Sequence, residues 1–117
     1  MGLSMNFPQD QVQELKRLFS DVSYAADGGY DYFLIRNVTL AKPCIPETTD
    51  VLLCPNAREG YNSRLYFPNK IQCEKQLNWN GTTFIFDRQW HAFSWQLQPI
   101  ERRLAQMVAS HLRGFIS

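Results

Sequence analysis

The sequence predicts an α+β domain in which a helix at each end flanks an antiparallel meander of about four strands. Apolar residues recur at helical spacing near both termini, whereas the middle of the chain carries short aromatic and β-branched runs separated by turn residues. Strands that follow one another without an intervening helix pair as a meander, and the terminal helices are then expected to cover one face. The chain has room for one such domain, so we expect residues 1–117 to form a single unit.

A first helix is predicted over residues 8–22. Pro8 has the fixed φ angle that suits the first position of a helix. Apolar side chains follow it at helical spacing, namely Val12, Leu15, Phe19 and Val22. The Asp-Gly-Gly sequence at residues 27–29 then predicts a turn.

Three central strands are predicted where apolar, aromatic and β-branched residues dominate. They cover residues 30–41, 51–54 and 63–67. The two prolines within residues 42–50 cannot donate to a ladder, so this segment is expected to connect two strands. The Pro68-Asn69 pair predicts a turn, and a loop that carries Cys73 is expected to follow it.

The last third of the chain is predicted to contain one more strand and a helix. The Asn80-Gly81 pair predicts a tight turn, and residues 82–87 predict the strand. An amphipathic helix is predicted from about Pro99 onward. One apolar stripe defines it: Ile100, Leu104, Met107, Val108, Leu112 and Phe115.

Composition and charge argue against several classes of protein. A net charge of +1 gives no electrostatic footprint for nucleic acid or for an anionic membrane. No apolar run is long enough to span a bilayer, and the first residues lack the features of a secretory signal. Three widely spaced cysteines favour free thiols in a reducing cytosol over a disulfide framework. We therefore expect a cytoplasmic protein that binds neither nucleic acid nor membrane.

No cofactor and no metal are expected. A glycine-rich phosphate loop after a strand is absent from the sequence. Structural zinc sites use closely spaced pairs of ligands, whereas the possible ligands of this chain are scattered. They are Cys44, Cys54, Cys73, His91 and His111.

The cysteines are therefore the main candidates for chemistry. Cys54 ends an apolar run and is expected to lie in the core. Cys44 lies between two prolines, with no general base nearby in the sequence. Cys73 follows a turn and precedes Glu74 and Lys75, which indicates an accessible thiol and makes it the candidate nucleophile. The alternative is an ordinary loop cysteine.

The segment FPNKIQC at residues 67–73, together with the order of the elements, resembles the ubiquitin-conjugating (ubiquitin-carrier) enzyme superfamily, in particular its small, divergent bacterial branch. The resemblance covers nearly the whole chain, including the tryptophan-containing segment before the final helix. In familiar members a His-Pro-Asn signature ends the third strand, and the catalytic cysteine follows on the next loop. Here Phe67 stands in the histidine position, Pro68 and Asn69 are retained, and Cys73 follows after a shorter interval.

This resemblance implies a carrier enzyme that needs no metal or nucleotide at its site. An activating enzyme would pass a ubiquitin-like protein to Cys73, which would hold it as a thioester until an amine of a protein substrate attacks. The resemblance makes Asn69 the candidate donor to the oxyanion, through its side-chain amide. His91 is the candidate proton acceptor for the incoming nucleophile. A bacterial member would act in the cytoplasm within an operon-encoded conjugation system, and defence against phage is one role of that kind.

Two other functions stay open. A non-catalytic binding module of the same fold would recruit the ubiquitin-like protein or its activating enzyme without a covalent step. The missing histidine and the short interval from Asn69 to Cys73 favour it. A cysteine hydrolase would pair Cys73 with His91, although the sequence identifies no third group to orient that pair, and a histidine in an aromatic run is more often a half-buried imidazole than a base. Cys44 and Cys54 also stay open as alternative nucleophiles.

Overall fold

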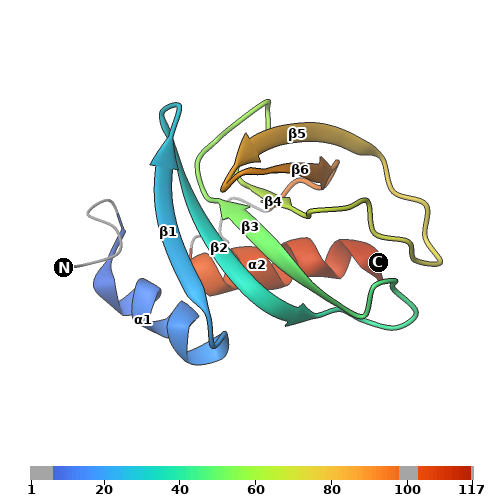
Figure 1. Cartoon of the computed structure of the whole chain (residues 1–117), viewed down its shortest axis with the longest axis horizontal. Helices are drawn as coiled ribbons and strands as arrows, with labels where there is room; N and C mark the ends of the chain where they lie inside the picture. The colour runs from blue at the N-terminus through green and yellow to red at the C-terminus, as the bar shows by residue number, and fades with distance from the viewer. Residues whose placement is uncertain (1–6, 98–102, 117) are drawn as a thin grey trace.

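The computed structural model describes residues 7–97 and 103–116 (Figure 1). In chain order, its elements are α1 (Gln9–Leu18), β1 (Val22–Asp27), β2 (Tyr30–Thr39), β3 (Thr48–Cys54), β4 (Arg64–Tyr66), β5 (Trp79–Ile85), β6 (Arg88–Phe93), α2 (Leu104–Leu112) and the 3-10 helix η1 (Arg113–Phe115). The predicted α+β class with antiparallel strands is confirmed. The expected meander is joined by a separate two-stranded sheet of β5 and β6.

The four-stranded sheet is a meander in the order β1-β2-β3-β4. Each strand pairs antiparallel with the next strand along the chain. The turn between β1 and β2 contains Gly28 and Gly29, whose φ angles of +59° and +86° lie in the left-handed region that glycine tolerates best. The turn predicted from the Asp-Gly-Gly sequence is therefore confirmed.

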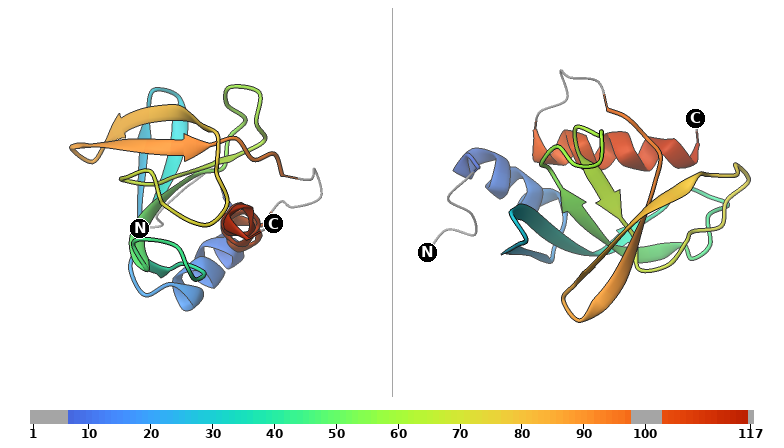
Figure 2. Two further views of the ribbon diagram at one scale, coloured as in Figure 1. Left: turned by 90° about the vertical axis from the view of Figure 1, so that its right-hand side faces the viewer. Right: turned by 90° about the horizontal axis from the view of Figure 1, so that it is seen from above.

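Both faces of the meander are covered. Figure 2 shows α2 on one side of the sheet and the β5–β6 hairpin on the other. The helix-side core consists of Val12, Leu15, Phe33, Ile35, Val38, Leu40, Cys44, Val51, Leu53, Leu65, Phe67, Ile71, Phe93, Leu104, Val108 and Phe115. The hairpin-side core consists of Tyr32, Leu34, Leu52, Cys54, Tyr66, Trp90 and Ala92. Burial on both faces explains why the central strands are unbroken apolar runs rather than alternating ones.

The first helix is shorter than the sequence predicts. Helix α1 ends at Leu18, and Phe19 is already extended, with φ −129° and ψ 130°. Val22 begins β1, where it pairs with Ile35 of β2 and packs against the helix-side core. The predicted extension of the helix to residue 22 is wrong because Val22 reaches the core from a strand, at a position that also continues the helical period.

The Asn80-Gly81 pair does not form a turn, so that prediction is also wrong. Both residues lie within β5, and the hairpin turns instead at Phe86 and Asp87, whose φ angles are 56° and 63°. Gly81 meets a requirement of packing, since a Cβ atom there would lie 2.8 Å from Nη1 of Arg64. A glycine within a strand can thus mark the close approach of a side chain rather than a turn.

The two helices contact each other, although they lie far apart in the sequence. The Nε atom of Arg103 donates to a carboxylate oxygen of Glu14 in α1 at 2.9 Å. The predicted final helix is confirmed from Leu104 to Leu112, whereas its predicted start at Pro99 lies outside the described residues. No described helix is both long and apolar enough to cross a membrane.

Candidate functional site

Phe67 anchors the start of the loop that carries Cys73. It directly follows β4, and its side chain is 0% exposed. Its ring centroid lies 5.9 Å, 6.0 Å and 5.3 Å from the ring centroids of Trp79, Phe93 and Phe115. Aromatic packing of this kind buries a large apolar area. It gives a structural reason for a large apolar side chain at this position.

Cys73 lies in the irregular segment 68–78, which joins β4 to β5. Its side chain is half-buried and packs against the helix-side core. The Sγ atom donates a hydrogen bond to the carbonyl oxygen of Lys75 at 3.0 Å. The thiol is therefore partly accessible, but it must release this hydrogen bond before it can act as a nucleophile.

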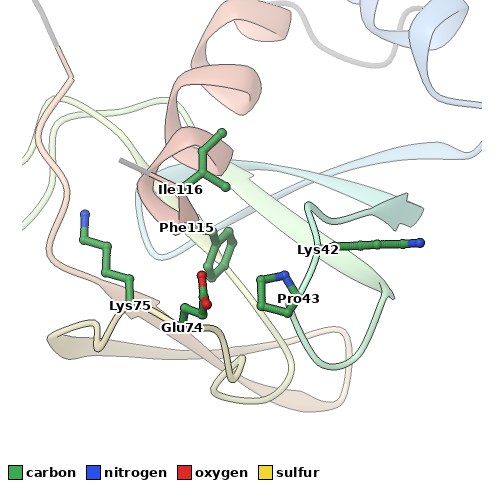
Figure 3. A pocket seen from close by; sticks show the side chains of 6 residues that line it. All are labelled: Lys42, Pro43, Glu74, Lys75, Phe115 and Ile116. Carbon is green, nitrogen blue, oxygen red and sulfur yellow. The ribbon is translucent and has the colours of Figure 1, made fainter.

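Two hollows adjoin this segment. One, of about 510 Å³, is lined by Cys73 together with its neighbours in residues 71–77 and Trp79. The other, of about 420 Å³, is shown in Figure 3. Its lining residues are Lys42, Pro43, Glu74, Lys75, Phe115 and Ile116. The surface around the thiol is thus concave, with charged and apolar side chains mixed along it.

Cys44 faces Cys73 across a bridge between two loops. Ile45 and Gln72 exchange both of their backbone hydrogen bonds, at 2.7 Å and 3.0 Å, and the antiparallel register places Cys44 opposite Cys73. Cys44 is only 3% exposed. Burial raises the pKa of the Cys44 thiol, and Cys73 raises it further through its charge and through a hydrogen bond between the two side chains. No local pattern in the sequence predicted this pairing.

Of the predicted partners of the nucleophile, Asn69 lies in the bend that begins the cysteine loop, and His91 lies in β6. The backbones of His91 and Phe67 exchange hydrogen bonds at 2.6 Å and 2.7 Å, so β6 brings His91 to the residue before Pro68. Nδ1 of His91 is buried and has no hydrogen-bond partner in the described part of the chain, and Asn69 is exposed. Among the residues that the structure describes, no hydrogen bond joins either side chain to Cys73.

Cys54 has a different environment. It ends β3 within the hairpin-side core and is 0% exposed, so the prediction that it is a core residue is confirmed. Its Sγ atom donates to Oδ1 of Asn56 at 3.8 Å. Burial raises the pKa of the Cys54 thiol, although Asn56 and the nearby Arg58 act in the opposite direction. A buried thiol whose pKa is raised is a poor nucleophile.

Arg64 is a buried charge whose role the sequence did not reveal. Its guanidinium donates to Glu59 at 2.8 Å, to the Asn80 side chain at 2.6 Å and to the carbonyl oxygen of Phe93 at 3.1 Å. The contacts with Asn80 and Phe93 tie β4 to the β5–β6 hairpin. They also explain the glycine in β5, because the guanidinium occupies the space that a side chain at residue 81 would need.

Comparison with known proteins gives no match. No protein-family model, no curated protein and no solved structure matches the chain. Within the described ranges, no three His, Cys, Asp or Glu side chains gather as a metal ion would require.

Proposed function

We propose that this chain is a carrier enzyme with a ubiquitin-conjugating-enzyme-like fold, in which Cys73 accepts a ubiquitin-like protein as a thioester. The observation that carries the proposal is the position of Cys73, a half-buried thiol on the irregular loop that follows the last meander strand and the bend at Pro68 and Asn69. The order of helix, meander, turn, cysteine loop and helix is the one that the resemblance implies. The β5–β6 hairpin lies between the cysteine loop and the final helix.

The proposed chemistry exchanges one bond in each of two steps. In the first step, the Cys73 thiolate attacks the carbonyl carbon of the ubiquitin-like protein on its activating enzyme, and the sulfur of that enzyme leaves. In the second step, an amine of a protein substrate attacks the same carbon, loses a proton and displaces the Cys73 sulfur. Neither step needs a metal or nucleotide at this site, because the activating enzyme has already consumed ATP.

Asn69 and His91 keep their proposed roles, on the condition that the cysteine loop moves. The Asn69 side chain is exposed, so its amide can turn toward an oxyanion formed at Cys73. The unpartnered Nδ1 of His91 is available as a proton acceptor. Catalytic hydrogen bonds are often loose in the free enzyme and tighten only when the substrate is bound.

A non-catalytic binding module is the second candidate, and a specific observation favours it. The Cys73 thiol donates to the Lys75 carbonyl oxygen, and it makes no hydrogen bond to Asn69 or His91 within the described residues. A module of this kind would use the concave surface around the loop to hold the ubiquitin-like protein or its activating enzyme. The cytoplasmic location and the role in defence against phage follow from the resemblance alone, and they belong to the proposal in both forms.

A non-reducing gel tests the proposal. The purified chain is incubated with ATP and with the activating enzyme and ubiquitin-like protein that its operon is expected to encode. We expect an adduct that a thiol reagent cleaves and that Cys73→Ala abolishes. Cys73→Ser should instead give an adduct that resists the thiol reagent, because an oxyester replaces the thioester.

The matched control is Cys54→Ala, which removes a thiol from the hairpin-side core and should leave the adduct intact. If the wild-type chain binds the partner but forms no adduct, the carrier proposal is wrong and the binding module replaces it. An adduct that maps to Cys44 would keep the function and move the site.

A further inference from the structure

The register of the bridge between the two loops places a second thiol directly opposite the candidate nucleophile. Ile45 and Gln72 exchange both backbone hydrogen bonds, so the next pair along the antiparallel register, Cys44 and Cys73, occupies a non-hydrogen-bonded position. The backbone N–H of Cys44 agrees with this position, since it donates to the carbonyl oxygen of Ala41 instead. In such positions the Cα atoms lie about 4.5 Å apart. Disulfides bridge Cα separations of about 4.4–6.8 Å.

The two thiols point to the same side of the bridge. Ile45 is 63% exposed and Gln72 is exposed, so their side chains lie on the outer side. Cys44 belongs to the helix-side core, and Cys73 packs against that core from its edge. Successive side chains along an extended backbone point to opposite sides, so the residue next to each exposed side chain points inward. The sulfur atoms are therefore juxtaposed on the inner side.

We propose that Cys44 and Cys73 form a reversible intramolecular disulfide when the protein meets hydrogen peroxide. The half-exposed Cys73 thiolate attacks one peroxide oxygen, the O–O bond breaks, and a sulfenic acid and hydroxide result. The Cys44 sulfur then attacks the Cys73 sulfur, the S–O bond breaks, and hydroxide leaves. The two thiol protons convert both hydroxides to water, so two thiols and one peroxide give one disulfide and two waters.

The two cysteines have unequal roles in this reaction. Cys73 is reachable from the hollow that it lines, whereas Cys44 is 3% exposed behind the same loop. Burial raises the pKa of the Cys44 thiol, which keeps it protonated and slow toward peroxide. Cys73 is therefore the sulfur that peroxide oxidises, and Cys44 is the sulfur that resolves the sulfenic acid.

The consequence for activity rests on the proposed function. A disulfide at Cys73 would block thioester formation until a reductant restored the thiol. It would also prevent the further oxidation of Cys73 to a sulfinic acid, which thiol reductants do not reverse. The pair would thus act as a reversible safeguard for the nucleophile.

The disulfide itself is tested on the isolated wild-type chain, without any partner. The chain is treated with hydrogen peroxide under native conditions, and remaining thiols are alkylated and counted by mass spectrometry. We expect the alkylated thiols to fall from three to one and the unalkylated mass to fall by two hydrogens. Dithiothreitol should restore all three. Trypsin leaves Cys44 and Cys54 in one peptide, residues 37–58, so cleavage at Glu47 is needed to show which of them is linked to Cys73.

The proposal is wrong if peroxide converts Cys73 to a sulfinic acid while Cys44 can still be alkylated. It is also wrong if the disulfide includes Cys54, or if covalent dimers form in place of the internal bond. Cys44→Ala is the matched variant, and Cys54→Ala is its control. After a peroxide pulse long enough to oxidise an unresolved sulfenic acid to the sulfinic acid, and then reduction with dithiothreitol, the wild type and Cys54→Ala should recover adduct formation on the gel, whereas Cys44→Ala should not. If no adduct forms even before oxidation, the proposed function fails, while the mapped disulfide stands or falls by its own measurement.

Discussion

Cys54 and Cys73 show how differently one fold can treat the same side chain. Cys54 ends a strand of a sheet whose two faces are covered, and its thiol is buried in the hairpin-side core with Oδ1 of Asn56 as its hydrogen-bond acceptor. Cys73 lies on an irregular loop that is covered on its inner side alone, with Cys44 opposite. The comparison teaches that the reactivity of a thiol in this protein depends on the layers that cover it. The residues beside it in the sequence matter less.

The largest expected effect is a difference in alkylation rate under native conditions. Cys54 reacts only when the sheet opens, whereas Cys73 needs only a local movement of its loop. We expect iodoacetamide to modify Cys73 at least about 1,000 times faster than Cys54. Mass spectrometry of peptides cleaved at Glu47 measures both rates. Rates within about tenfold of each other would contradict the comparison.

Removal of the aromatic anchor should cause the largest change in stability. Phe67→Ala empties a fully buried site between Trp79, Phe93 and Phe115, and we expect the free energy of unfolding to fall by about 3–5 kcal/mol. Denaturant unfolding measures the change. The matched control is Phe84→Ala, which truncates a side chain that is 60% exposed and should change the free energy by less than about 0.5 kcal/mol. Similar losses for the two variants would show that Phe67 is not an anchor.

A smaller effect separates the two thiols when each is replaced by serine. Cys54→Ser places a more polar hydroxyl group in the hairpin-side core, and the Asn56 Oδ1 acceptor is 3.8 Å away from the present sulfur, so we expect the free energy of unfolding to fall by about 1–3 kcal/mol. Cys73→Ser places the hydroxyl on a half-buried loop, where it can donate to the same Lys75 carbonyl oxygen. The expected change is within about 0.5 kcal/mol. Equal losses in denaturant unfolding would remove the contrast between the two sites.

The smallest effect is a dependence of stability on pH. Burial raises the pKa of the Cys54 thiol above its ordinary value of 9.0. Below that pH the thiol is protonated in both the folded and the unfolded state, so Cys54 does not make the free energy of unfolding depend on pH there. Above pH 9.0 the unfolded chain loses the proton first, and stability falls as pH rises. We expect Cys54→Ala to reduce this slope by up to about 1.4 kcal/mol per pH unit. Unfolding of both proteins between about pH 8 and pH 10 measures it, and identical slopes would contradict the expectation.

The sequence predicts a structural feature correctly where neighbouring residues determine that feature. The apolar run that ends at Cys54 predicts a buried strand, and the structure has one there, with both faces covered. The glycines at residues 28 and 29 predict the turn that their positive φ angles form. Sequence reasoning failed where the cause lies across space. Gly81 accommodates the guanidinium of Arg64, and the approach of Cys44 to Cys73 depends on a bridge between two loops distant in the sequence. The half-exposed position of Cys73 was predictable from its polar neighbours, but its second thiol was not.

The meander also has a consequence for the order in which the molecule folds. Each strand pairs with its neighbour in the sequence, so only short loops must close to form the sheet and the hairpin. The contact between Arg103 and Glu14 joins residues 89 positions apart. We expect the strands to gain protection from amide exchange first during refolding, and the two helices last. The helix-side core, which holds Cys44 together with Leu104 and Val108 of α2, would then be the final part of the protein to be completed during refolding.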